Sequence, residues 1–463
     1  MRCISSLLLL PSLAFAIPST NHHGRVIFKD VVVVGGGASG TYAAIRLAQE
    51  NKTVAVIERN DRLGGQVNTY KDPKTGAPFD HGVMVYGNDT ISNNFFSYLG
   101  VKMARFSGHI KSNAYADFST GKIISAATAM NMTGNYLTAL GSWRAQLDKY
   151  LWLSNETGFH LPETIPDELF LPFGEYSAKY NLGGLMALLA TTVQNGYLLQ
   201  TPTFYMMKWL NINQSALKGI SQADGNNQAI YDAAQAKLGE DSVFLNSTIQ
   251  RITRFEDFVE IVFSTPSGEH IVIADQLVMS IPPKLETLDF LDVSKHEHKL
   301  FKQFSSKFIY TTVLLNTGLS SEQVIQNFNP QKGTFGIPYS AATAAFSPSQ
   351  HISSAAFAQY ASPYSQTEDE VKANIFADFE RVQKAFNLTS PHGTKPILTD
   401  FYSHSPYFFT VPEESIRGGF YNKLNSLQGK HRTWWTGAAF ESQDSAGLWL
   451  FTEKELLPRI LKA

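Results

Sequence analysis

The chain of 463 residues contains a single cysteine, Cys3, and no cluster of basic residues. One cysteine cannot close a disulfide within the chain, so the fold has to be held by packed side chains. With 38 Lys and Arg against 40 Asp and Glu, the formal net charge is −2, which argues against a nucleic acid partner. The pairs His22-His23 and His296/His298 lack accompanying ligands, so we expect no metal site.

Long apolar runs are also missing beyond the N-terminus. After residue 16 no stretch reaches the ~18 uncharged apolar residues of a membrane-spanning helix, so we expect no integral membrane anchor. Hydrophobic residues make up 43% of the chain and aromatic residues 12%, which is enough for a large core and excludes general disorder. A chain of this length predicts two intertwined domains.

The first residues have the pattern of a secretory signal peptide. Arg2 supplies the positive charge, residues 7–15 the apolar region, and Ala14-Phe15-Ala16 the small-x-small cleavage site. We expect cleavage after Ala16, which removes Cys3 and leaves a polar arm over residues 17–28. A buried first strand is the alternative, and the missing polar alternation disfavours it. The expected location is the secretory pathway or the extracellular space.

Asn-x-Ser/Thr sequons fit that route, although each triplet alone is a weak signal. Asn51 is the least favourable of them, because it lies in a tight turn between a helix and a strand. We expect N-glycans at some of Asn51, Asn88, Asn131, Asn155, Asn213, Asn246 and Asn387.

The strongest pattern starts at Val31. The β-branched run Val31–Val34 ends in Gly35-x-Gly37-x-x-Gly40, and apolar residues at helical spacing follow up to Glu50. A second apolar run, Thr53–Ile57, carries Glu58 at its carboxyl end. Strand, glycine turn, helix and strand together predict a βαβ unit of a parallel sheet, which a merely flexible glycine turn would not explain.

The glycines of this unit predict a dinucleotide site. Gly35 permits the tight turn, Gly37 lets a pyrophosphate approach the backbone, and Gly40 lets the helix pack on the strand. The N–H groups at the start of the helix, around Ser39, face the phosphates. Glu58 lies 58 − 35 = 23 residues beyond Gly35, close to the roughly 20 expected for a carboxylate that accepts ribose hydroxyls.

Two further segments indicate which dinucleotide binds. Asp61-Arg62-Leu63-Gly64-Gly65-Gln66 resembles the Arg-x-Gly-Gly signature of the flavin-containing amine oxidoreductase family, in which the glycine pair contacts the FAD pyrophosphate and ribitol. Phe79–Gly87 is similar to the family's Asp-x-Gly segment beside the flavin ring. The resemblance implies FAD as the cofactor. Because the mature chain has no cysteine, FAD should be non-covalent unless a histidine forms a link.

The resemblance covers three segments in family order and implies an α/β fold. A Rossmann-like FAD-binding domain of glutathione-reductase or amine-oxidase type would be interleaved with a mixed α+β substrate domain. The expected division is signal peptide 1–16, polar arm 17–28, FAD-binding parts 29–90, 240–290 and 406–463, a mostly helical substrate-domain part 91–239, and a second substrate-domain part 291–405.

Apolar periodicity predicts the elements within these parts. Strands are expected at 242–245, 249–252, 259–263, 270–274, 276–280, 308–315 and 353–360, and helices at 136–152, 182–193, 204–209, 368–386 and 444–460. The aromatic and methionine run 204–209 fits either the lining of an apolar site or ordinary core packing.

The cofactor contacts carried over from the family follow its motifs. The backbone at Ile249 would meet the adenine, and the helix start near Gly447 would point N–H groups at flavin N1 and O2. Asn60 and Gln66 stand where the family usually has arginines, so phosphate neutralisation should rely more on backbone. The expected contacts are Gly35, Gly37, Ser39, Gly40, Glu58, Arg59, Arg62, Gly64, Gly65, Gln66, Gly82, Ile249, Gly437, Gly447 and Leu448.

Two residues are candidates for a catalytic role. Lys307 falls near the place of a lysine that holds a water against flavin N5 in amine oxidases, and the alternative is a plain surface charge. Leu448 stands where monoamine oxidases have one tyrosine of their aromatic cage, which makes a simple monoamine substrate improbable. Trp449 is the candidate to replace that ring in part.

The opening VVVVGGGASGTYAA and the late Gly437-Ala-Ala-Phe block resemble the fungal β-cyclopiazonate dehydrogenase group. The resemblance implies hydride transfer from a hydrophobic alkaloid or terpenoid to flavin N5, with ring closure by an internal nucleophile. One alternative is a redox-neutral FAD-dependent isomerase of polyunsaturated fatty acids. Another is a secreted binding protein with a decayed flavin site, which the intact glycines and Glu58 disfavour.

Overall fold

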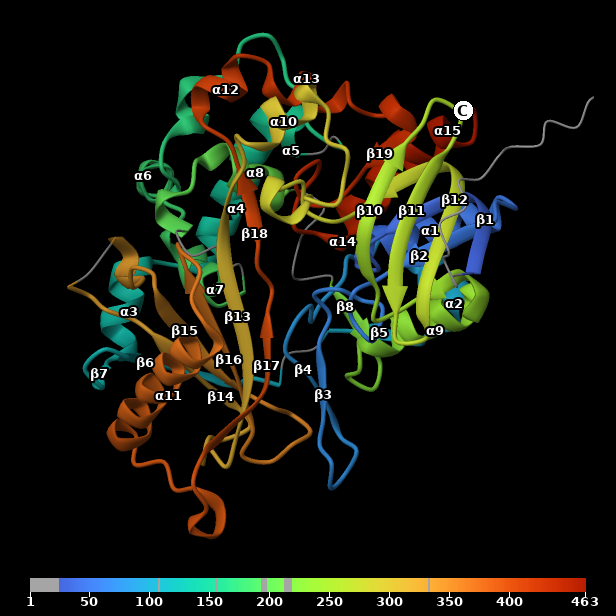
Figure 1. Ribbon diagram of the computed structural model, residues 1–463. Coiled ribbons are helices and arrows are strands. Elements are labelled where there is room, and N and C mark those ends of the chain that lie inside the picture. The colour runs from blue at the N-terminus through green and yellow to red at the C-terminus, as the bar shows by residue number, and fades with distance from the viewer. Residues whose placement is uncertain (1–24, 107–108, 155–156, 193–197, 212–218, 332–333) are drawn as a thin grey trace, which may run out of the picture.

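The structure is a computed structural model that describes residues 25–106, 109–154, 157–192, 198–211, 219–331 and 334–463 (Figure 1). Two large sheets organise it, one of seven strands and one of eight. The predicted signal peptide and the sequons at Asn155 and Asn213 lie outside the described residues.

The first sheet contains the predicted βαβ unit. Its strand β1 pairs in parallel with β12 on one side and β2 on the other, and both of its faces are covered at Val31–Val34, which are buried. The order is β10 (Thr248–Arg254), β11 (Val259–Thr265), β12 (Gly268–Met279), β1 (Arg25–Val34), β2 (Val54–Ile57) and β9 (Val243–Phe244), with β19 (Thr433–Trp435) beside β12.

Two strand boundaries in this sheet differ from the expectation. Residues 25–28, expected in a polar arm, form the start of β1 and pair with residues 270–273 of β12. The two strands expected at 270–274 and 276–280 are one continuous strand, β12. In both places the backbone pairing between β1 and β12 continues through polar residues. These polar residues had suggested that the strands end there.

Helices α1 (Ala38–Gln49), α2 (Thr90–Leu99) and α9 (Gln228–Leu238) pack together beside this sheet, with α14 (Ser445–Phe451) against α1 and α2 (Figure 1). The single helix expected over 444–460 is interrupted: a π-helical turn, Thr452–Leu456, separates α14 from α15 (Leu457–Ile460). Pro458 at the start of α15 has no N–H to donate, so regular α-helical bonding cannot continue through it.

The second sheet is mostly antiparallel and carries α11 (Glu368–Ala385) on one face. Its order is β17 (Ile397–Ser403), β13 (Ser305–Leu315), β16 (Ala356–Ser362), β15 (Ala342–Pro348), β14 (Gln323–Asn327), β6 (Ser112–Asp117) and β7 (Lys122–Ile124), with β18 (Tyr407–Thr410) beside β13.

Alternation along β13 defines the two faces of this sheet. Tyr310 and Leu314 belong to the core formed with α11, whereas Val313 packs with Phe79 from the FAD-binding part of the chain. Because side chains alternate along a strand, the odd-numbered residues of β13 face that part. Lys307 and Thr311 are on this face.

A helical region joins the two sheets, as expected for residues 91–239, although this stretch also contributes strands to the second sheet. Its helices are α3 (Ala126–Thr133), α4 (Tyr136–Leu147), α5 (Leu151–Ser154), α6 (Phe173–Lys179), α7 (Met186–Thr192) and α8 (Thr203–Trp209). The remaining helices are α10 (Lys295–Phe301), α12 (Glu413–Arg417) and α13 (Phe420–Asn425). Short two-stranded sheets form between β3 (Thr69–Lys71) and β4 (Pro78–Asp80), and between β5 (Met103–Arg105) and β8 (Ile220–Gln222).

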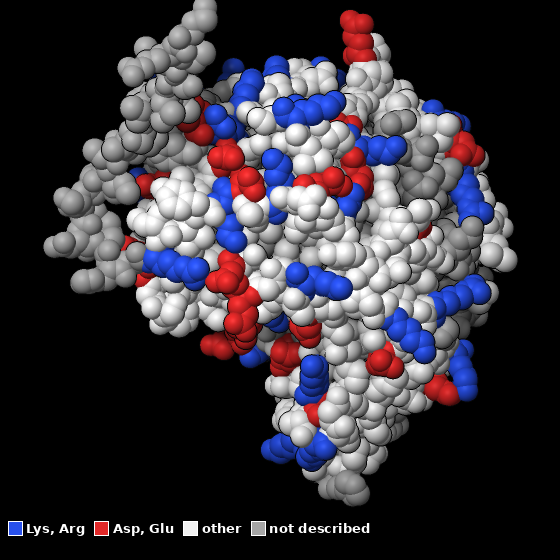
Figure 2. All heavy atoms as spheres, turned by 90° about the vertical axis from the view of Figure 1, so that its right-hand side faces the viewer, with Lys and Arg blue, Asp and Glu red and all other residues white. Residues whose placement is uncertain are grey.

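The surface carries both signs of charge. Figure 2 shows one face of the molecule on which Lys and Arg side chains are interspersed with Asp and Glu. Within the described ranges, no helix has the length and apolar character needed to cross a membrane.

Trp449 has a different place from the one expected for a substrate contact. The side chain is 0% exposed and lies stacked between Tyr42 and Tyr86, with Phe95 and Phe96 at its edges. Its indole N–H donates to the carbonyl of Ala38 at 3.1 Å. A ring that lined a substrate cavity would be partly exposed in a structure without substrate, so the expectation for Trp449 is corrected: it packs α14 onto α1.

Truncating this ring should therefore cost stability. We expect Trp449→Ala to lower the free energy of unfolding by about 3–5 kcal/mol, because it leaves a cavity in the aromatic cluster. Trp449→Phe keeps most of the packing and should cost less. Urea denaturation of the apoprotein measures both. Equal stability of Trp449→Ala and the unchanged protein would contradict this packing role.

Candidate functional site

The glycine turn at the end of β1 has the geometry of a phosphate site. Gly35 has a φ of +98°, and a Cβ on Gly40 would overlap the carbonyl oxygen of Gly35 and lie 2.5 Å from Ser280 Oγ. A Cβ on Gly37 would meet only Gly65 Cα, at 3.9 Å, so no side chain covers this position. Helix α1 starts here without a side-chain cap, which leaves its first N–H groups available to an anion.

Glu58 lies at the carboxyl end of β2, as predicted. It is 6% exposed, its Oε2 accepts from the Gly36 N–H at 2.6 Å, and its Oε1 accepts from the Asn60 N–H at 2.8 Å. The carboxylate is thus fixed beside the glycine turn, where a ribose would follow the pyrophosphate. Arg59, the next residue, is exposed.

The segment before β10 forms backbone hydrogen bonds with Glu58 and Asn60. The N–H of Ser247 donates to the carbonyl of Glu58 at 2.9 Å, and the N–H of Asn246 donates to that of Asn60 at 2.8 Å. Ile249 is half-buried two residues further along, at a bulge between β10 and β11. This arrangement brings the predicted adenine contact next to the predicted ribose contact.

The Gly64-Gly65 pair lies directly on the glycine turn. The Gly64 N–H donates to the Gly36 carbonyl at 2.8 Å, and a Cβ on Gly65 would come within 2.9 Å of Gly37 Cα. Both glycines have positive φ, of +118° and +56°. Two backbone segments therefore meet over the phosphate position, and side chains there would block it.

Gly82 continues this arrangement toward the second sheet. A Cβ on Gly82 would overlap the carbonyl oxygen of Gln66, which also accepts from the Val83 N–H at 3.2 Å. The Gln66 amide donates to the carbonyl of His404 at 3.4 Å. The segments at 64–68 and 81–83 thus form one layer.

Arg62 has a different function in the structure from the predicted cofactor contact. Its guanidinium donates to Gln228 Oε1 at 2.9 Å and to Asn68 Oδ1, and it lies 5.4 Å from the centre of the Tyr402 ring. These contacts tie the loop after β2 to α9 and to the second sheet, so backbone groups remain the main phosphate donors.

The last expected FAD-binding part, 406–463, also lies next to the glycine turn. Gly437 has a φ of +100°, and a Cβ on it would lie 3.3 Å from the Ser280 carbonyl and 4.0 Å from Ser39 Oγ. At the start of α14, however, the Asp444 carboxylate accepts from the Gly447 N–H at 2.7 Å and from the Ala446 N–H at 3.3 Å. The N–H groups expected to face the flavin are therefore capped by the chain itself.

A buried ion pair lies next to this cap. Lys208 Nζ is 3.0 Å from Glu441 Oε1, and both side chains are 2% exposed. Burial raises the pKa of Glu441 to about 7, although Lys208 acts against this shift. Gly447 adjoins Glu441, and Leu448 is buried behind it.

Lys307 is half-buried on β13, opposite Tyr407 of β18. Burial lowers the pKa of its ammonium group from the ordinary value. The side chain is on the face of the second sheet that looks toward the FAD-binding parts. Its predicted water-holding role stays a prediction.

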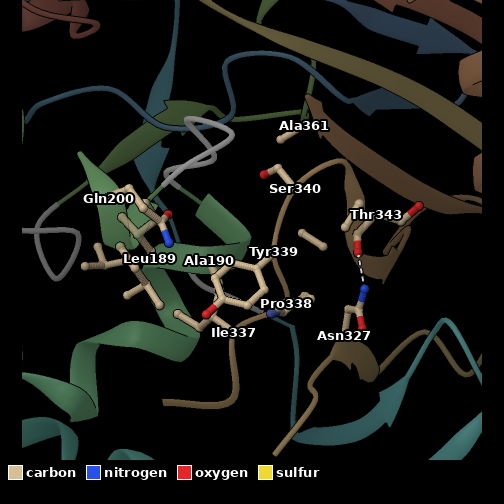
Figure 3. A pocket seen from close by; sticks show the side chains of 14 residues that line it. Leu189, Ala190, Gln200, Asn327, Ile337, Pro338, Tyr339, Ser340, Thr343 and Ala361 are labelled. Carbon is tan, nitrogen blue, oxygen red and sulfur yellow. Dashed lines mark hydrogen bonds between the residues drawn. The ribbon is translucent and has the colours of Figure 1, made fainter. Parts of the chain in front are cut away.

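An apolar pocket opens on the same face of this sheet (Figure 3). Leu189 and Leu199 from the helical region form one wall, and Ile337 and Tyr339 form another. The floor includes Ala361 of β16, which is paired with Ile309 of β13. Since Lys307 is two residues from Ile309 on the same face, roughly 7 Å along the strand, the pocket adjoins it.

A polar cluster that sequence analysis did not predict lies between the two sheets, and it is buried except at Asp400, whose side chain is 41% exposed. Asn68, His81, Thr311, Asp400 and His404 are linked by hydrogen bonds, and we call this cluster the polar seam. Its members are separated by up to 336 residues, so no spacing rule could have joined them. His81 lies in the Phe79–Gly87 segment, and this was the one available signal.

The role of Glu58 can be tested by removing its charge. Because hydrogen bonds to a carboxylate contribute about 1.5–3 kcal/mol, Glu58→Gln should weaken FAD binding roughly 10- to 100-fold. Titrating apoprotein with FAD and following flavin fluorescence gives the dissociation constant. Glu163→Gln, at an exposed carboxylate in the helical region, is the matched control. Unchanged affinity in Glu58→Gln would refute the ribose assignment.

Comparison with known proteins agrees with this geometry. Residues 33–100 match the model of an NAD(P)-binding Rossmann-like domain. The structure is similar to a CLA-producing fatty acid isomerase from P. acnes, with a TM-score of 0.70 and 16% identity over 93% of this chain and 98% of that one. It is also similar to putrescine oxidase bound to putrescine, with a TM-score of 0.64 and 17% identity, over 94% of this chain and 100% of that one. At these identities the likeness shows the fold alone, and it confirms the predicted fold class.

Relatives in sequence cover nearly the whole chain. The FAD-dependent oxidoreductase dbaF of Emericella nidulans is 34% identical over 449 residues, which are 95% of this chain and 92% of the relative. The β-cyclopiazonate dehydrogenase of Aspergillus oryzae is 31% identical over 443 residues, 93% of this chain and 92% of the relative. The backbone at Gly37 and Gly65 without side chains, the uncapped α1 and the buried Glu58 fit the dinucleotide that these names imply. The chain therefore belongs to the family of FAD-dependent oxidoreductases that includes β-cyclopiazonate dehydrogenase, and its cofactor is FAD.

Proposed function

We propose that this FAD-dependent oxidoreductase oxidises a small hydrophobic metabolite of the alkaloid or terpenoid class. Bound FAD supplies the oxidation by accepting a hydride at N5. Where the oxidised substrate carries an internal nucleophile, attack on the resulting cation or imine closes a ring. The cofactor is held non-covalently, since the chain has no cysteine besides Cys3.

The apolar pocket is the observation that carries this proposal. Its walls are mostly aliphatic. Three alanines on the sheet (Ala342, Ala344 and Ala361) leave space at its base because their side chains are small. Asn327 and Thr343 supply a few polar groups, with the Asn327 amide donating to the Thr343 carbonyl at 2.7 Å. An apolar body with one or two polar atoms fits such a lining.

The protein's part in the reaction is mainly orientation. The pocket holds the substrate on the sheet face that carries Lys307, and the surrounding aliphatic side chains exclude water. Burial lowers the pKa of Lys307, so its neutral amine, which can accept a hydrogen bond from a water molecule, forms more readily than that of a surface lysine. The proton that the internal nucleophile releases on ring closure passes to water, and no side chain is assigned as its acceptor.

A fatty acid isomerase of the same fold is the competing function, because an apolar pocket also suits an acyl chain. The two functions differ in their need for an electron acceptor. An oxidoreductase leaves the flavin reduced until an acceptor is supplied, whereas an isomerase returns the hydride and leaves the spectrum unchanged at the end of the reaction. Anaerobic mixing with candidate metabolites and with linoleic acid separates them by lasting loss of the visible flavin absorbance.

Filling the pocket should weaken the binding of the substrate that causes this loss of flavin absorbance. We expect Ala361→Leu to raise the concentration for half-maximal anaerobic bleaching about 5- to 100-fold, from an overpacking cost of about 1–3 kcal/mol. The visible spectrum and FAD affinity of the variant should stay unchanged, which serves as the internal control. Bleaching at the same concentration as in the unchanged protein would exclude this pocket as the substrate site.

We also propose that the chain follows the secretory route and carries N-glycans. The side chains of Asn51, Asn131, Asn246 and Asn387 are exposed, which supports their accessibility to glycosylation. Protein secreted by a fungal host should start at Ile17 and lose mass on treatment with an N-glycosidase. N-terminal sequencing and mass spectrometry measure both. A protein that retains Met1 and does not change mass would contradict the proposal.

A further inference from the structure

The polar seam consists of five side chains that bond in sequence. His81 Nε2 lies 2.9 Å from Asp400 Oδ2, and His81 Nδ1 lies 3.2 Å from Thr311 Oγ1. Thr311 Oγ1 lies 3.1 Å from His404 Nε2, and the Asn68 amide nitrogen lies 3.2 Å from the same Nε2. His81 is 0% exposed and His404 is 7% exposed.

The seam joins the cofactor site to the second sheet. Asn68 and His81 belong to the layer that rests on the glycine turn, and the His81 N–H donates to the Asn68 carbonyl at 2.9 Å. Thr311 belongs to β13, and Asp400 lies in β17, which is followed by His404. The only side-chain bond that links Gln66 to the sheet also ends at His404, on its backbone carbonyl, within the described residues.

The hydrogen-bond donors around His404 determine which ring nitrogen carries a proton. The Asn68 amide nitrogen can only donate, so His404 Nε2 has to accept and carries no proton. The Thr311 hydroxyl donates to the same nitrogen and accepts from His81 Nδ1. His81, bonded through its other nitrogen to the Asp400 carboxylate, then donates from both nitrogens.

The surroundings of His404 oppose its protonation. Burial, and then the charges of His81 and Arg62, lower the pKa of His404 to about 3. Asp400 is the one carboxylate of the seam, and the His81 hydrogen bond lowers its pKa. The ring of Tyr402 also lies near, with its centre 5.5 Å from that of His404.

We propose that His404 is a positioning residue that locks the FAD-binding loop Gly64–Asn68 onto the second sheet, and that uptake of a proton by His404 opens this lock and releases FAD. This inference requires only that FAD is the cofactor and does not depend on the substrate. A proton on Nε2 turns the shared acceptor into a donor that faces the Asn68 amide and the Thr311 hydroxyl. The new positive charge also lies close to Arg62 and His81. The loop then loses the Asn68 contact with the sheet and keeps only the longer Gln66 bond to the His404 carbonyl and the Arg62 contact with Tyr402, so Gly64-Gly65 are held less firmly on the glycine turn.

The sign of the pH dependence follows from the lowered pKa. The closed seam keeps His404 neutral down to about pH 3, whereas an open seam lets it titrate near its ordinary value of about 6.5. Closing is therefore favoured above pH 6.5 and weakens by up to tenfold per pH unit below it. FAD affinity should be constant above pH 7 and should fall as the pH drops below 6.

The test measures FAD release from the purified holoenzyme at pH 4.5–8. After ultrafiltration at each pH, the fluorescence of free FAD in the filtrate gives the fraction released. His404→Gln places an amide oxygen near Nε2, which still accepts and cannot take up a proton. We expect this variant to bind FAD within about tenfold of the unchanged protein at pH 7.5 and to lose most of the acid-induced release.

A second variant keeps the test informative if His404→Gln fails to fold. Thr311→Val removes the hydroxyl that donates to His404 and preserves the side-chain volume, so His404 becomes easier to protonate and FAD release should move to higher pH. His298→Gln, at an exposed histidine of α10, should leave the release curve unchanged. Release curves of His404→Gln and Thr311→Val that coincide with that of the unchanged protein would overturn the proposal, as would FAD that stays bound down to pH 4.5.

Discussion

The close contact of two backbone segments determines most of this structure. Gly64-Gly65 rest directly on the turn Gly35–Gly40, where a Cβ on Gly65 would come within 2.9 Å of Gly37 Cα, and the predicted pyrophosphate site lies beside this contact. The groups that can face the pyrophosphate are therefore backbone groups: the uncapped N–H groups of α1 and the backbone at Gly437, which lies against Ser280, whereas the Gly36 N–H already donates to Glu58. This explains how the chain can bind a dianionic cofactor where its family usually places arginines. Arg62, the nearest cation by sequence, is used to fasten the loop.

The same contact couples the cofactor site to the second sheet. The loop that seats on the glycine turn continues into Gln66 and Asn68, and these two residues touch His404. A displacement of the sheet relative to the first domain would therefore pull on the cofactor loop. The apolar pocket is built on that sheet, so if it is the substrate site as proposed, the seam also influences the distance between substrate and flavin. The seam therefore couples the position of the cofactor loop to that of the proposed substrate pocket.

The sequence predicted local structure where it followed from local physics. Val31–Val34 and Thr53–Ile57 are apolar, short and bounded by glycine or charge, and they form β1 and β2 nearly as expected. The start of β1 and the continuity of β12 depend on pairing between residues over 240 positions apart, which periodicity cannot detect. Trp449 was misassigned for a similar reason: its neighbours Tyr42, Tyr86 and Phe95 come from distant elements. The His404 and Thr311 contacts likewise exist only after the sheet is folded.

The acidic groups near α14 change the expected electrostatics of the site. A free helix start would stabilise negative charge on a reduced ring, but the Asp444 carboxylate already occupies the Ala446 and Gly447 N–H groups. Glu441 adds a second carboxyl group next to Gly447, and Lys208 forms an ion pair with it. Burial raises the pKa of Glu441 to about 7, so it is partly protonated at neutral pH and its charge responds to a neighbouring negative group. The local charge at this end of the site is therefore set by a capped helix start and a buried ion pair rather than by a free helix dipole.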